Sequence, residues 1–386
     1  MAFMYWTSLG RSSSFFLTSR SSNPLNYYQP PTVYNIDGLS ILQWSYIVTV
    51  SVDLEKGFNK LSPSNSLGKR MLFLTDEDVK KVLTMEEAIE EVERAFKEYA
   101  AGNVVLPPRS TIMVERFNGS ISFMPSYIRG LEAQAVKIIS IYPDNPSKGL
   151  PTTLAWLVVN NTETGVVKAF MEASYLTAVR TGAVTGVAAK YLAPEDARVL
   201  AVFGAGVQGR TQAWAACTVR DIETIYVYDP VPQARQRFAE EMAEKLGVKV
   251  VAVDSGREAC READMVVTAT TSREPVLRRG WLKDKVHISA IGAFYPDWRE
   301  LDTATVADSK LVIDDMEGIR MEAGDILIPI KEGAITWDHV YAELKELVSG
   351  AKPGRLPEDG LTVFKSVGIA IQDSSVANLV LRKLGH

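Results

Sequence analysis

The stretch Arg198–Arg210 reads RVLAVFGAGVQGR and decides the fold of this chain. It begins with five apolar residues, Val199–Phe203, which have the length and composition of a buried β-strand. Three glycines at the spacing G-x-G-x-x-G follow, and the residues from Arg210 onward favour a helix. This order of strand, glycine turn and helix is typical of a dinucleotide-binding βαβ unit, where a pyrophosphate lies on free N–H groups at a helix N-terminus.

A second predicted strand, Thr224–Tyr228, ends at Asp229, twenty positions after Gly209. An acidic residue at this spacing accepts hydrogen bonds from an adenosine ribose and repels a 2′-phosphate. We therefore expect NAD or NADP as the cofactor and favour NAD, although Arg235 stands close enough in sequence to weaken that preference. The alternative is a nucleotide-free α/β domain in which Asp229 only begins a turn. The predicted cofactor-binding turn comprises Gly204, Ala205, Gly206, Val207, Gln208 and Gly209.

Length and composition limit the remaining possibilities. A chain of 386 residues predicts two domains and an additional segment. The net charge of −5 provides no basic surface for nucleic acid, and no apolar run reaches the ~18–20 residues of a membrane span. The two cysteines, Cys217 and Cys260, fit small buried residues in a reducing compartment, which predicts a cytoplasmic protein. The three histidines have unrelated spacings, so no metal site is predicted.

Residues 1–70 differ from the rest of the chain. The first acidic residue is Asp37, Ser, Tyr, Asn and Pro are abundant, and no helical or strand period persists before Met71. Three interpretations remain open: a start site assigned upstream of the true one, a disordered extension, or a transit peptide, of which we favour the first. In each case we expect little order here and no role in the chemistry.

Residues 71–190 predict an α+β domain. Thr75 and Thr84 each precede acidic residues and have the pattern of helix N-caps. Several strands follow without helices between them, which indicates an antiparallel or mixed sheet. The predicted strands are 120–125, 133–142, 152–160 and 166–171, and a helix rich in small residues is predicted over 173–192.

Residues 191–371 predict a Rossmann-type doubly wound parallel sheet, because strands alternate with helices from the glycine turn onward. A ligand then binds at the carboxyl edge of the sheet. The apolar pattern of 366–384 predicts a final helix that crosses back, so that 372–386 complete the first domain. The further strands predicted for the second domain are 248–253, 265–270, 285–291 and 310–314.

From Met71 onward, five motifs in order resemble the ornithine cyclodeaminase/mu-crystallin family over about four-fifths of the chain. The resemblance implies a homodimer formed through the first domain, a Rossmann domain as the second, and a site in the cleft between them. It also implies a nicotinamide cofactor and a small α-amino or α-imino acid as substrate. The matching stretches are 135–155, 172–193, 199–213, 287–302 and 362–373.

Such a substrate carries a carboxylate, and a site needs fixed cations to hold it. Arg109 follows two prolines that fix its direction, and an arginine presents a bidentate fork to a carboxylate. Lys137 stands between apolar residues in a predicted strand, where an unpaired charge is costly. Arg180 lies on the helix of small residues. In the family, the residues matching these three line the substrate and nicotinamide end of the cleft, although each could instead be a structural charge.

Further cofactor contacts are expected where strands end at the carboxyl edge. The segments 266–271 and 289–292 are expected to flank the nicotinamide ribose, and Ser366 and Gly368 are expected to close over the nicotinamide. Asp144, in a sequence rich in Pro and Gly, is interpreted as part of a simple turn. The individual residues predicted to contact the cofactor outside the glycine turn are Asp229, Thr181, Thr270, Ile291 and Ser366.

One position departs from the ornithine cyclodeaminases. These enzymes resemble one another in an aspartate directly after two small residues, and here the position holds Phe294. Phenylalanine can neither take nor give a proton, whereas cyclodeamination requires protons to move throughout. Asp297 is three positions further on and is interpreted as a residue that caps the next turn.

These observations favour NAD(P)H-dependent reduction of a small cyclic imino acid, such as Δ1-pyrroline-2-carboxylate, to an L-amino acid of the proline type. This reaction requires fewer proton transfers by the protein than cyclodeamination does, because the cofactor supplies hydride and the protein orients the carboxylate. Three alternatives stay open: an alanine dehydrogenase acting on pyruvate and ammonia, an ornithine cyclodeaminase, and a non-catalytic binding protein of the mu-crystallin type.

Overall fold

The computed structural model describes residues 2–9, 12–19, 32–36, 39–44, 47–52 and 71–386, and the chain divides into two units, Met1–Arg70 and Met71–His386. The first unit contains an antiparallel sheet in the order β1-β2-β5-β4-β3. Its strands are β1 (Ala2–Leu9), β2 (Ser12–Ser19), β3 (Thr32–Ile36), β4 (Leu39–Trp44) and β5 (Ile47–Val52).

These strands occur although the sequence before Met71 shows no persistent strand period, and the expectation of little order in residues 1–70 stays a prediction. Short stretches such as Ile47–Val52 are rich in β-branched residues, which favour extended structure. Such stretches can pair with one another even where none of them shows a clear period alone. The origin of residues 1–70 and their separation from the chemistry stay predictions.

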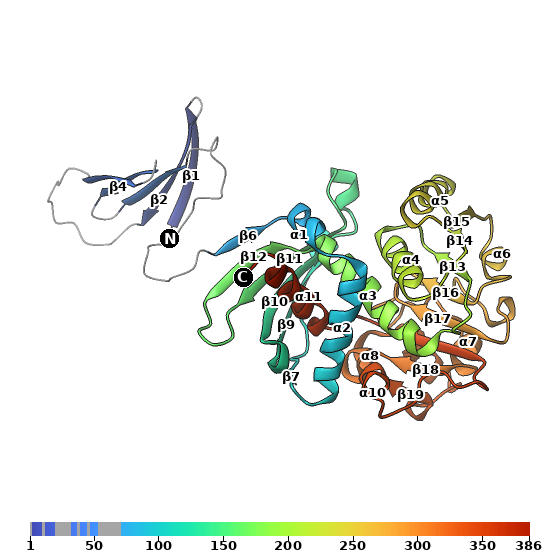
Figure 1. Ribbon diagram of the computed structural model, residues 1–386. Coiled ribbons are helices and arrows are strands. Elements are labelled where there is room, and N and C mark those ends of the chain that lie inside the picture. The colour runs from blue at the N-terminus through green and yellow to red at the C-terminus, as the bar shows by residue number, and fades with distance from the viewer. Residues whose placement is uncertain (1, 10–11, 20–31, 37–38, 45–46, 53–70) are drawn as a thin grey trace. The chain divides into compact units, whose positions relative to one another are not determined.

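The second unit begins with a sheet in the order β6-β12-β11-β10-β9-β7, with β8 paired to β9. All its pairs are antiparallel except β12 with β6. The α+β domain predicted from the sequence is therefore present (Figure 1). Its strands are β6 (Leu72–Leu74), β7 (Val104–Val105), β8 (Ser110–Val114), β9 (Gly119–Ile128), β10 (Ala133–Ile141), β11 (Thr153–Asn160) and β12 (Val167–Glu172).

Helices cover one face of this sheet. Thr75 and Thr84 are N-caps as predicted, because their hydroxyls accept from the backbone N–H groups of Asp78 and Glu87. Along β11, Leu157 is buried on the helix side while its neighbour Trp156 points to the other face. The helices of this domain are α1 (Asp76–Val82), α2 (Met85–Ala100), α3 (Ser174–Leu192) and α11 (Ala370–Lys383).

Helix α3 links the two parts of the unit, packing against both α2 and α4. Its small residues permit this close approach. A Cβ atom at Gly182 would lie 2.6 Å from the carbonyl oxygen of Thr211, and one at Gly186 would lie 2.6 Å from a side-chain carbon of Ile89. The helix ends at Leu192, as the sequence predicts, and its C-cap Ala193 directly precedes Pro194.

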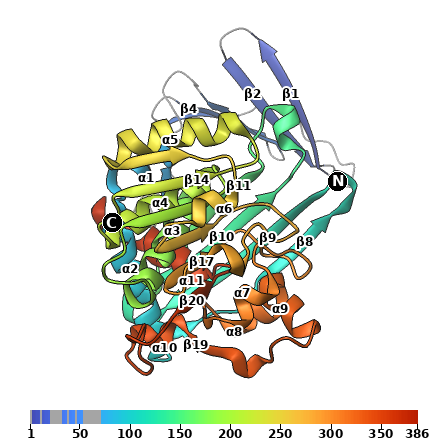
Figure 2. The same cartoon turned by 90° about the vertical axis from the view of Figure 1, so that its right-hand side faces the viewer.

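The second sheet is wholly parallel, in the order β15-β14-β13-β16-β17-β20-β18-β19 (Figure 2). This is the predicted Rossmann-type doubly wound fold, and β13 lies where the strand order reverses. Strand β20 joins the middle of the sheet although it follows all the other seven in sequence. The strands are β13 (Val199–Phe203), β14 (Thr224–Tyr228), β15 (Lys249–Ala252), β16 (Met265–Thr268), β17 (Val286–Ala290), β18 (Lys310–Ile313), β19 (Val340–Glu343) and β20 (Leu361–Lys365).

The helices around this sheet include several short ones that the sequence did not predict, between residues 314 and 361. Most have a single turn or two, too short for a helical period to show. In the described residues, no helix combines the length and the apolarity needed to cross a membrane. The helices are α4 (Val207–Val219), α5 (Pro232–Leu246), α6 (Gly256–Cys260), α7 (Thr303–Ala307), α8 (Met316–Glu322), α9 (Gly324–Lys331) and α10 (Leu344–Val348).

Helix α11 returns to the first sheet and packs on β9, β10, α2 and α3, as the apolar pattern predicts (Figure 1). It begins at Ala370 and not at Ser366. The reason is local: Ser366 and the backbone after it are bound by Asp314, and Gly368 adopts φ +78°, which ends any helical path there.

Candidate active site

Lys137 lies in the middle of β10 and points toward the helices. Its side chain is fully buried, and its Nζ donates to Oδ2 of Asp373 on α11 at 2.7 Å. The alternation of β10 places Ala135 and Lys137 on the same face, so the strand that carries apolar residues into the core carries this cation as well.

Arg180 reaches the same carboxylate from α3. Its Nε donates to Oδ1 of Asp373 at 2.8 Å, and its Nη1 donates to Oε1 of Gln372 at 2.6 Å. Asp373 is 1% exposed and Gln372 is fully buried. Two cations therefore share one carboxylate inside the protein, which leaves an excess positive charge where an anion would be stabilised.

Arg109 lies at the other side of the segment that precedes α11. Its Nη2 donates to the carbonyl oxygen of Gly368 at 2.6 Å and to that of Val367 at 3.2 Å, and its Nε lies 3.2 Å from a carboxylate oxygen of Glu322. Arg180 borders the same glycine, since a Cβ atom on Gly368 would lie 2.8 Å from its Nη1. The three predicted cations are thus brought to one region.

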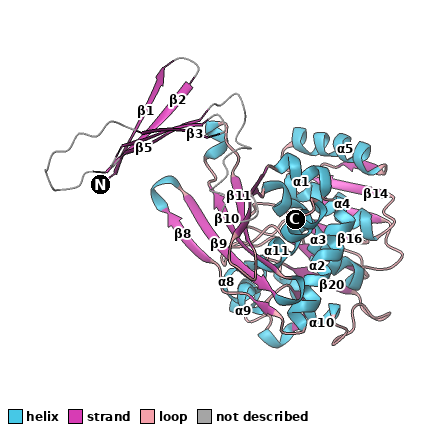
Figure 3. Cartoon of the chain, turned by 60° about the vertical axis from the view of Figure 1, so that its left-hand side comes forward, coloured by secondary structure: helices cyan, strands magenta, loops and turns pink. Residues whose placement is uncertain are grey.

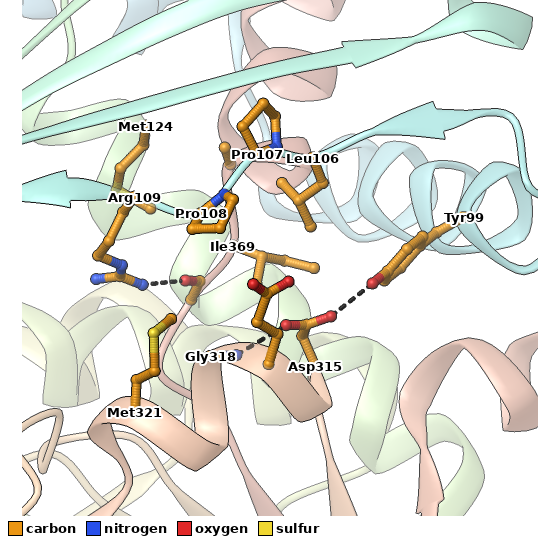
Figure 4. A pocket seen from close by; sticks show the side chains of 13 residues that line it. Tyr99, Leu106, Pro107, Pro108, Arg109, Met124, Asp315, Gly318, Met321 and Ile369 are labelled. Carbon is orange, nitrogen blue, oxygen red and sulfur yellow. Dashed lines mark hydrogen bonds between the residues drawn. The ribbon is translucent and has the colours of Figure 1, made fainter.

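A small pocket of about 50 Å³ opens beside Arg109 (Figure 4). On one wall, Tyr99 donates to a carboxylate oxygen of Asp315 at 2.5 Å. Glu317 adds a second carboxylate to the lining, whereas Lys137 and Arg180 are not among the lining residues, and the other walls are mainly apolar. Its apolar lining comprises Leu106, Pro107, Pro108, Met124, Met321 and Ile369.

The electrostatics of Lys137 differ from those of an ordinary lysine. Burial, together with the charge of Arg180, lowers its pKa to about 7, while the Asp373 carboxylate opposes the change. Lys137 can therefore exist in either protonation state near neutral pH, which is the property of a group that exchanges protons.

The segment between β20 and α11 is held by a buried carboxylate. Oδ2 of Asp314, at the end of β18, accepts from the hydroxyl of Ser366 at 2.7 Å and from the backbone N–H groups of Val367 and Gly368 at 2.9 and 2.8 Å. Burial raises the pKa of Asp314. The Ser366 hydroxyl, expected at the nicotinamide, is thus engaged with Asp314 in this structure.

The glycine turn has the form that a dinucleotide requires. A Cβ atom at Gly204 would lie 2.5 Å from the carbonyl oxygen of Ala269, and one at Gly209 would lie 2.0 Å from the carbonyl oxygen of Gly204. At Gly206 nothing lies within 4 Å, so the space above the turn is open. Helix α4 also begins without a side-chain cap, which leaves its first N–H groups for a pyrophosphate. The glycine turn and the start of α4 therefore fit a bound dinucleotide.

Asp229 supports this turn from the end of β14. Its Oδ2 accepts from the backbone N–H of Ala205 and its Oδ1 from that of Val231, both at 2.9 Å. Arg235 donates to the carbonyl oxygen of Asp229 at 3.0 Å and forms an ion pair with Asp254. The arginine that weakened the preference for NAD is therefore engaged with an acidic residue.

The remaining predicted cofactor residues occupy different places. Thr181 lies on α3, where its hydroxyl donates to Thr177 and its carbonyl accepts from Gln212 at 3.0 Å. Ile291 follows β17 and is 7% exposed. Thr270 follows β16 and donates to the buried Glu300 through both its backbone N–H and its hydroxyl, at 2.7 and 2.8 Å. Their contacts with a cofactor stay predictions.

Phe294 stands in an aromatic group in the segment that follows β17. Its ring centroid lies 4.8 Å from that of Tyr295, which in turn lies 4.7 Å from that of Trp298. Asp297 is exposed at the surface. Asp144 directly precedes a short 3₁₀ helix, in keeping with the predicted turn.

The sequence did not identify four residues of this region: Gln372, Asp373, Asp314 and Glu300. A signal existed for Asp373, because it is the one acidic residue in 366–384 and ends the last family-like motif. The other three are recognisable only once the strand ends and α11 are assembled. Across the described part of the chain, no cluster of three His, Cys, Asp or Glu residues has the arrangement of a metal site.

The chain is similar to known proteins over most of its length. The sequence profile of the ornithine cyclodeaminase/mu-crystallin family matches residues 69–385. The chain belongs to this family. The resemblance inferred from the five motifs is thereby confirmed.

Relatives within the family are oxidoreductases of imino and amino acids. The Δ1-pyrroline-2-carboxylate reductase of Bacillus cereus is 36% identical over 81% of this chain and 96% of its own. The structure of the Thermococcus litoralis enzyme of the same name, in complex with NADH and L-proline, has a TM-score of 0.80 and 49% identity over 81% and 97% of the two chains. An archaeal alanine dehydrogenase dimer with bound NAD has a TM-score of 0.77 and 36% identity over 81% and 95%. These neighbours bind NAD or NADH, which supports the predicted nicotinamide cofactor.

Proposed function

We propose that the protein reduces a small cyclic imino acid, such as Δ1-pyrroline-2-carboxylate, to the corresponding L-amino acid with NADH or NADPH. The observation that carries this proposal is the pair Lys137 and Arg180, two buried cations that share the single carboxylate of Asp373. Their excess positive charge suits a substrate carboxylate, and Arg109 lies at the same segment of chain. The similar reductases of Bacillus cereus and Thermococcus litoralis agree with it.

The cofactor would lie with its pyrophosphate over Gly204–Gly209 and would supply hydride. The protein then has two tasks. Arg180 and Arg109 hold the carboxylate and so orient the C=N bond. Lys137, with a pKa lowered to about 7, holds the proton that the ring nitrogen takes up as hydride adds to the adjacent carbon. The addition of one hydride and one proton to the C=N bond completes the reduction.

Phe294 supports reduction over cyclodeamination. Its place after β17 is the one where ornithine cyclodeaminases resemble one another in having an aspartate, and its neighbours Tyr295 and Trp298 make the surroundings aromatic. Asp297 is exposed and offers no evident replacement. The amination of pyruvate is the second candidate, because the archaeal alanine dehydrogenase is also similar.

The test is a substrate panel with the full chain and both cofactors: Δ1-pyrroline-2-carboxylate, its six-membered analogue, pyruvate with ammonia, and ornithine with NAD. We expect kcat/KM for a cyclic imino acid to exceed that for pyruvate about tenfold or more. We expect NADH to be preferred, because Asp229 disfavours a 2′-phosphate. Faster amination of pyruvate, proline with ammonia from ornithine, or cofactor binding without any turnover would contradict the proposal.

A homodimer is part of the proposal. The face of the first sheet that lacks helices carries Phe73, Trp156 and Phe170, and the Trp156 and Phe170 rings stack at 5.0 Å. The hairpin of β8 and β9 extends outward (Figure 3). Its residues Ile112 and Met113 are exposed. Such an apolar face fits a second copy of this chain, and the similar alanine dehydrogenase is a dimer. Sedimentation equilibrium checks it, and the mass of a single chain would contradict it.

The predicted cytoplasmic location also belongs to this proposal. Cys217 and Cys260 are both free thiols, as expected in a reducing compartment.

A further inference from the structure

The ends of three neighbouring strands are joined by a buried charged cluster of Glu300, Asp325 and Lys365. Strands β16, β17 and β20 lie on one side of β13, whereas β14 and β15 lie on the other. In a doubly wound sheet the two halves of a dinucleotide lie on opposite sides of the point where the strand order reverses. Because Asp229 ends β14, the adenosine half belongs on that side. The ends of β16 and β17 therefore face the nicotinamide half.

Glu300 connects the two segments that leave β16 and β17. Its Oε1 accepts from the backbone N–H of Thr270 at 2.7 Å and from the Thr270 hydroxyl at 2.8 Å. Its Oε2 accepts from the Thr268 hydroxyl at 2.8 Å and from the backbone N–H of Gly292 at 2.7 Å. One side chain thus binds three residues from two strand ends.

The pattern of donors requires a carboxylate at this position. Each oxygen of Glu300 accepts from one backbone N–H, and a backbone N–H cannot reverse its role. An amide would place its NH2 group against the N–H of either Thr270 or Gly292. The segments are also tightly packed, since a Cβ atom at Gly292 would lie 2.3 Å from the carbonyl oxygen of Thr270.

Glu300 is itself held in place by the rest of the cluster. Oδ1 of Asp325 accepts from the backbone N–H groups of Glu300 and Leu301 at 2.7 and 2.9 Å. Lys365, at the end of β20, lies 2.7 Å from Oδ2 of Asp325 and donates to the carbonyl oxygen of Ala293 at 2.6 Å. Glu300, Asp325 and Lys365 are all 1% exposed or less. The cluster therefore fixes both segments without help from solvent.

We propose that Glu300 is a positioning residue that holds the segments after β16 and β17 in the shape that receives the nicotinamide half of the cofactor. Glu300 acts through Thr270 and Gly292 and need not touch the cofactor. The inference rests on the nicotinamide cofactor of the proposed function, and it does not depend on which imino acid is reduced.

The experiment compares two probes that share one half of the cofactor. NADH occupies both halves of the site, whereas ADP contains only the adenosine and the pyrophosphate. In the full-length variant Glu300→Gln we expect the Kd for NADH to rise about tenfold, as for loss of hydrogen bonds to a charged group. The Kd for ADP should stay within about twofold, because Asp229 and the glycine turn are unchanged. Calorimetric titration measures both.

A matched control lies at the opposite edge of the sheet. Asp264 directly precedes β16, and its Oδ2 accepts from the backbone N–H groups of Arg198 and Val199 at 2.8 and 2.9 Å. Asp264→Asn should lower thermal stability without changing the ratio of the two Kd values. Equal weakening of NADH and ADP in Glu300→Gln, or no weakening of either, would overturn the proposal.

A milder variant covers the case in which Glu300→Gln does not fold. Thr268→Val removes one hydroxyl donor from Oε2 of Glu300 and keeps the shape of the buried side chain. We expect the ratio of the Kd for NADH to that for ADP to rise about threefold, from the weaker loss of one hydrogen bond. An unchanged ratio in this variant would overturn the proposal equally.

Discussion

Two buried clusters in this protein contain a lysine but balance its charge in opposite ways. In the first, Lys137 and Arg180 share the one carboxylate of Asp373. In the second, the single cation Lys365 lies with Asp325, and Glu300 is attached to Asp325 through its backbone N–H. When Lys137 is protonated, the first cluster therefore has two cations for one carboxylate. The second has two carboxyl groups for one cation, and burial beside Asp325 raises the pKa of Glu300.

The surrounding protein compensates the charges of the two clusters differently. Burial and the charge of Asp325 raise the pKa of Glu300, and four donors from the backbone and from threonine hydroxyls oppose that change by binding its carboxylate form. In the first cluster Asp373 is the one carboxylate that pairs with Lys137 or Arg180 in the described residues. A buried charge without compensation is costly, and we therefore propose that an anion such as a substrate carboxylate completes the first cluster. The comparison separates a cluster that supports the fold from one prepared for a ligand.

The largest effect should come from removing the cation of the second cluster. Lys365→Met leaves the carboxylates of Asp325 and Glu300 buried without a cation. We expect the free energy of unfolding to fall by about 3–5 kcal/mol, as when one partner of a buried pair is removed. Urea denaturation measures it. A decrease in the free energy of unfolding of less than about 1 kcal/mol would show that this cluster does not support the fold. The proposed difference between the two clusters would then be wrong.

The corresponding change in the first cluster should act on catalysis. Lys137→Met leaves Arg180 paired with Asp373, so the free energy of unfolding should change by no more than about 1 kcal/mol. We expect kcat/KM for the imino acid to fall about 10²–10³-fold, as when one preorganised charged donor is lost. Steady-state kinetics measures it. Lys168→Met, on strand β12 of the same sheet, is the control and should retain activity. Equal losses of stability in Lys137→Met and Lys365→Met would contradict the comparison.

The smallest expected effect is a shift in the pH dependence of kcat/KM. If charged Lys137 is needed, kcat/KM should decrease above pH 7, where this lysine, with its pKa lowered to about 7, loses its proton. Asp373 opposes that lowering, so Asp373→Asn should move the decrease to lower pH by about one unit. A profile that stays level to pH 9, or an unmoved limb in the variant, would remove Lys137 from proton transfer.

The same lysine also links stability to pH. Its pKa is lower in the folded protein than the ordinary value of 10.5, so the folded state binds fewer protons between about pH 7 and 10.5. Its contribution to the free energy of unfolding therefore increases as the pH rises through that window. Lys137→Met should make this dependence flatter in urea titrations at several pH values.

The sequence predicted the fold where patterns were long. The glycine turn, the helix of small residues over 173–192 and the apolar tail all have periods or spacings that span many residues, and each is present. Two boundaries differ, because α4 begins at Val207 and not at Arg210, and α11 at Ala370 and not at Ser366. The short helices and strands between 314 and 365 were not predicted, because elements of four to eight residues show little period. The strands in residues 2–52 were missed for the same reason.

The site was predictable in its cations and not in its anions. Lys137 and Arg180 stand out because a charge among apolar or small residues is conspicuous. Asp373 and Glu300 lie among other polar residues in the sequence, and their partners come from distant segments. Only the assembled fold shows that each carboxylate meets several donors.

The position of β20 has a consequence for how the molecule folds. This strand lies between β17 and β18 in the middle of the parallel sheet, and α11, a few residues later, fills the face of the first sheet. The hydrophobic cluster of the first domain includes Phe364 and residues of α11, and one cluster of the parallel sheet includes Leu361 and Val363. These two clusters cannot be completed until the end of the chain is available, and the edges of β17 and β18 stay unpaired until then. Such long-range pairing is slow, and it populates intermediates whose exposed hydrophobic surface and unpaired strand edges favour aggregation. Folding of the two domains should therefore finish together, late, and with a need for protection from aggregation during synthesis.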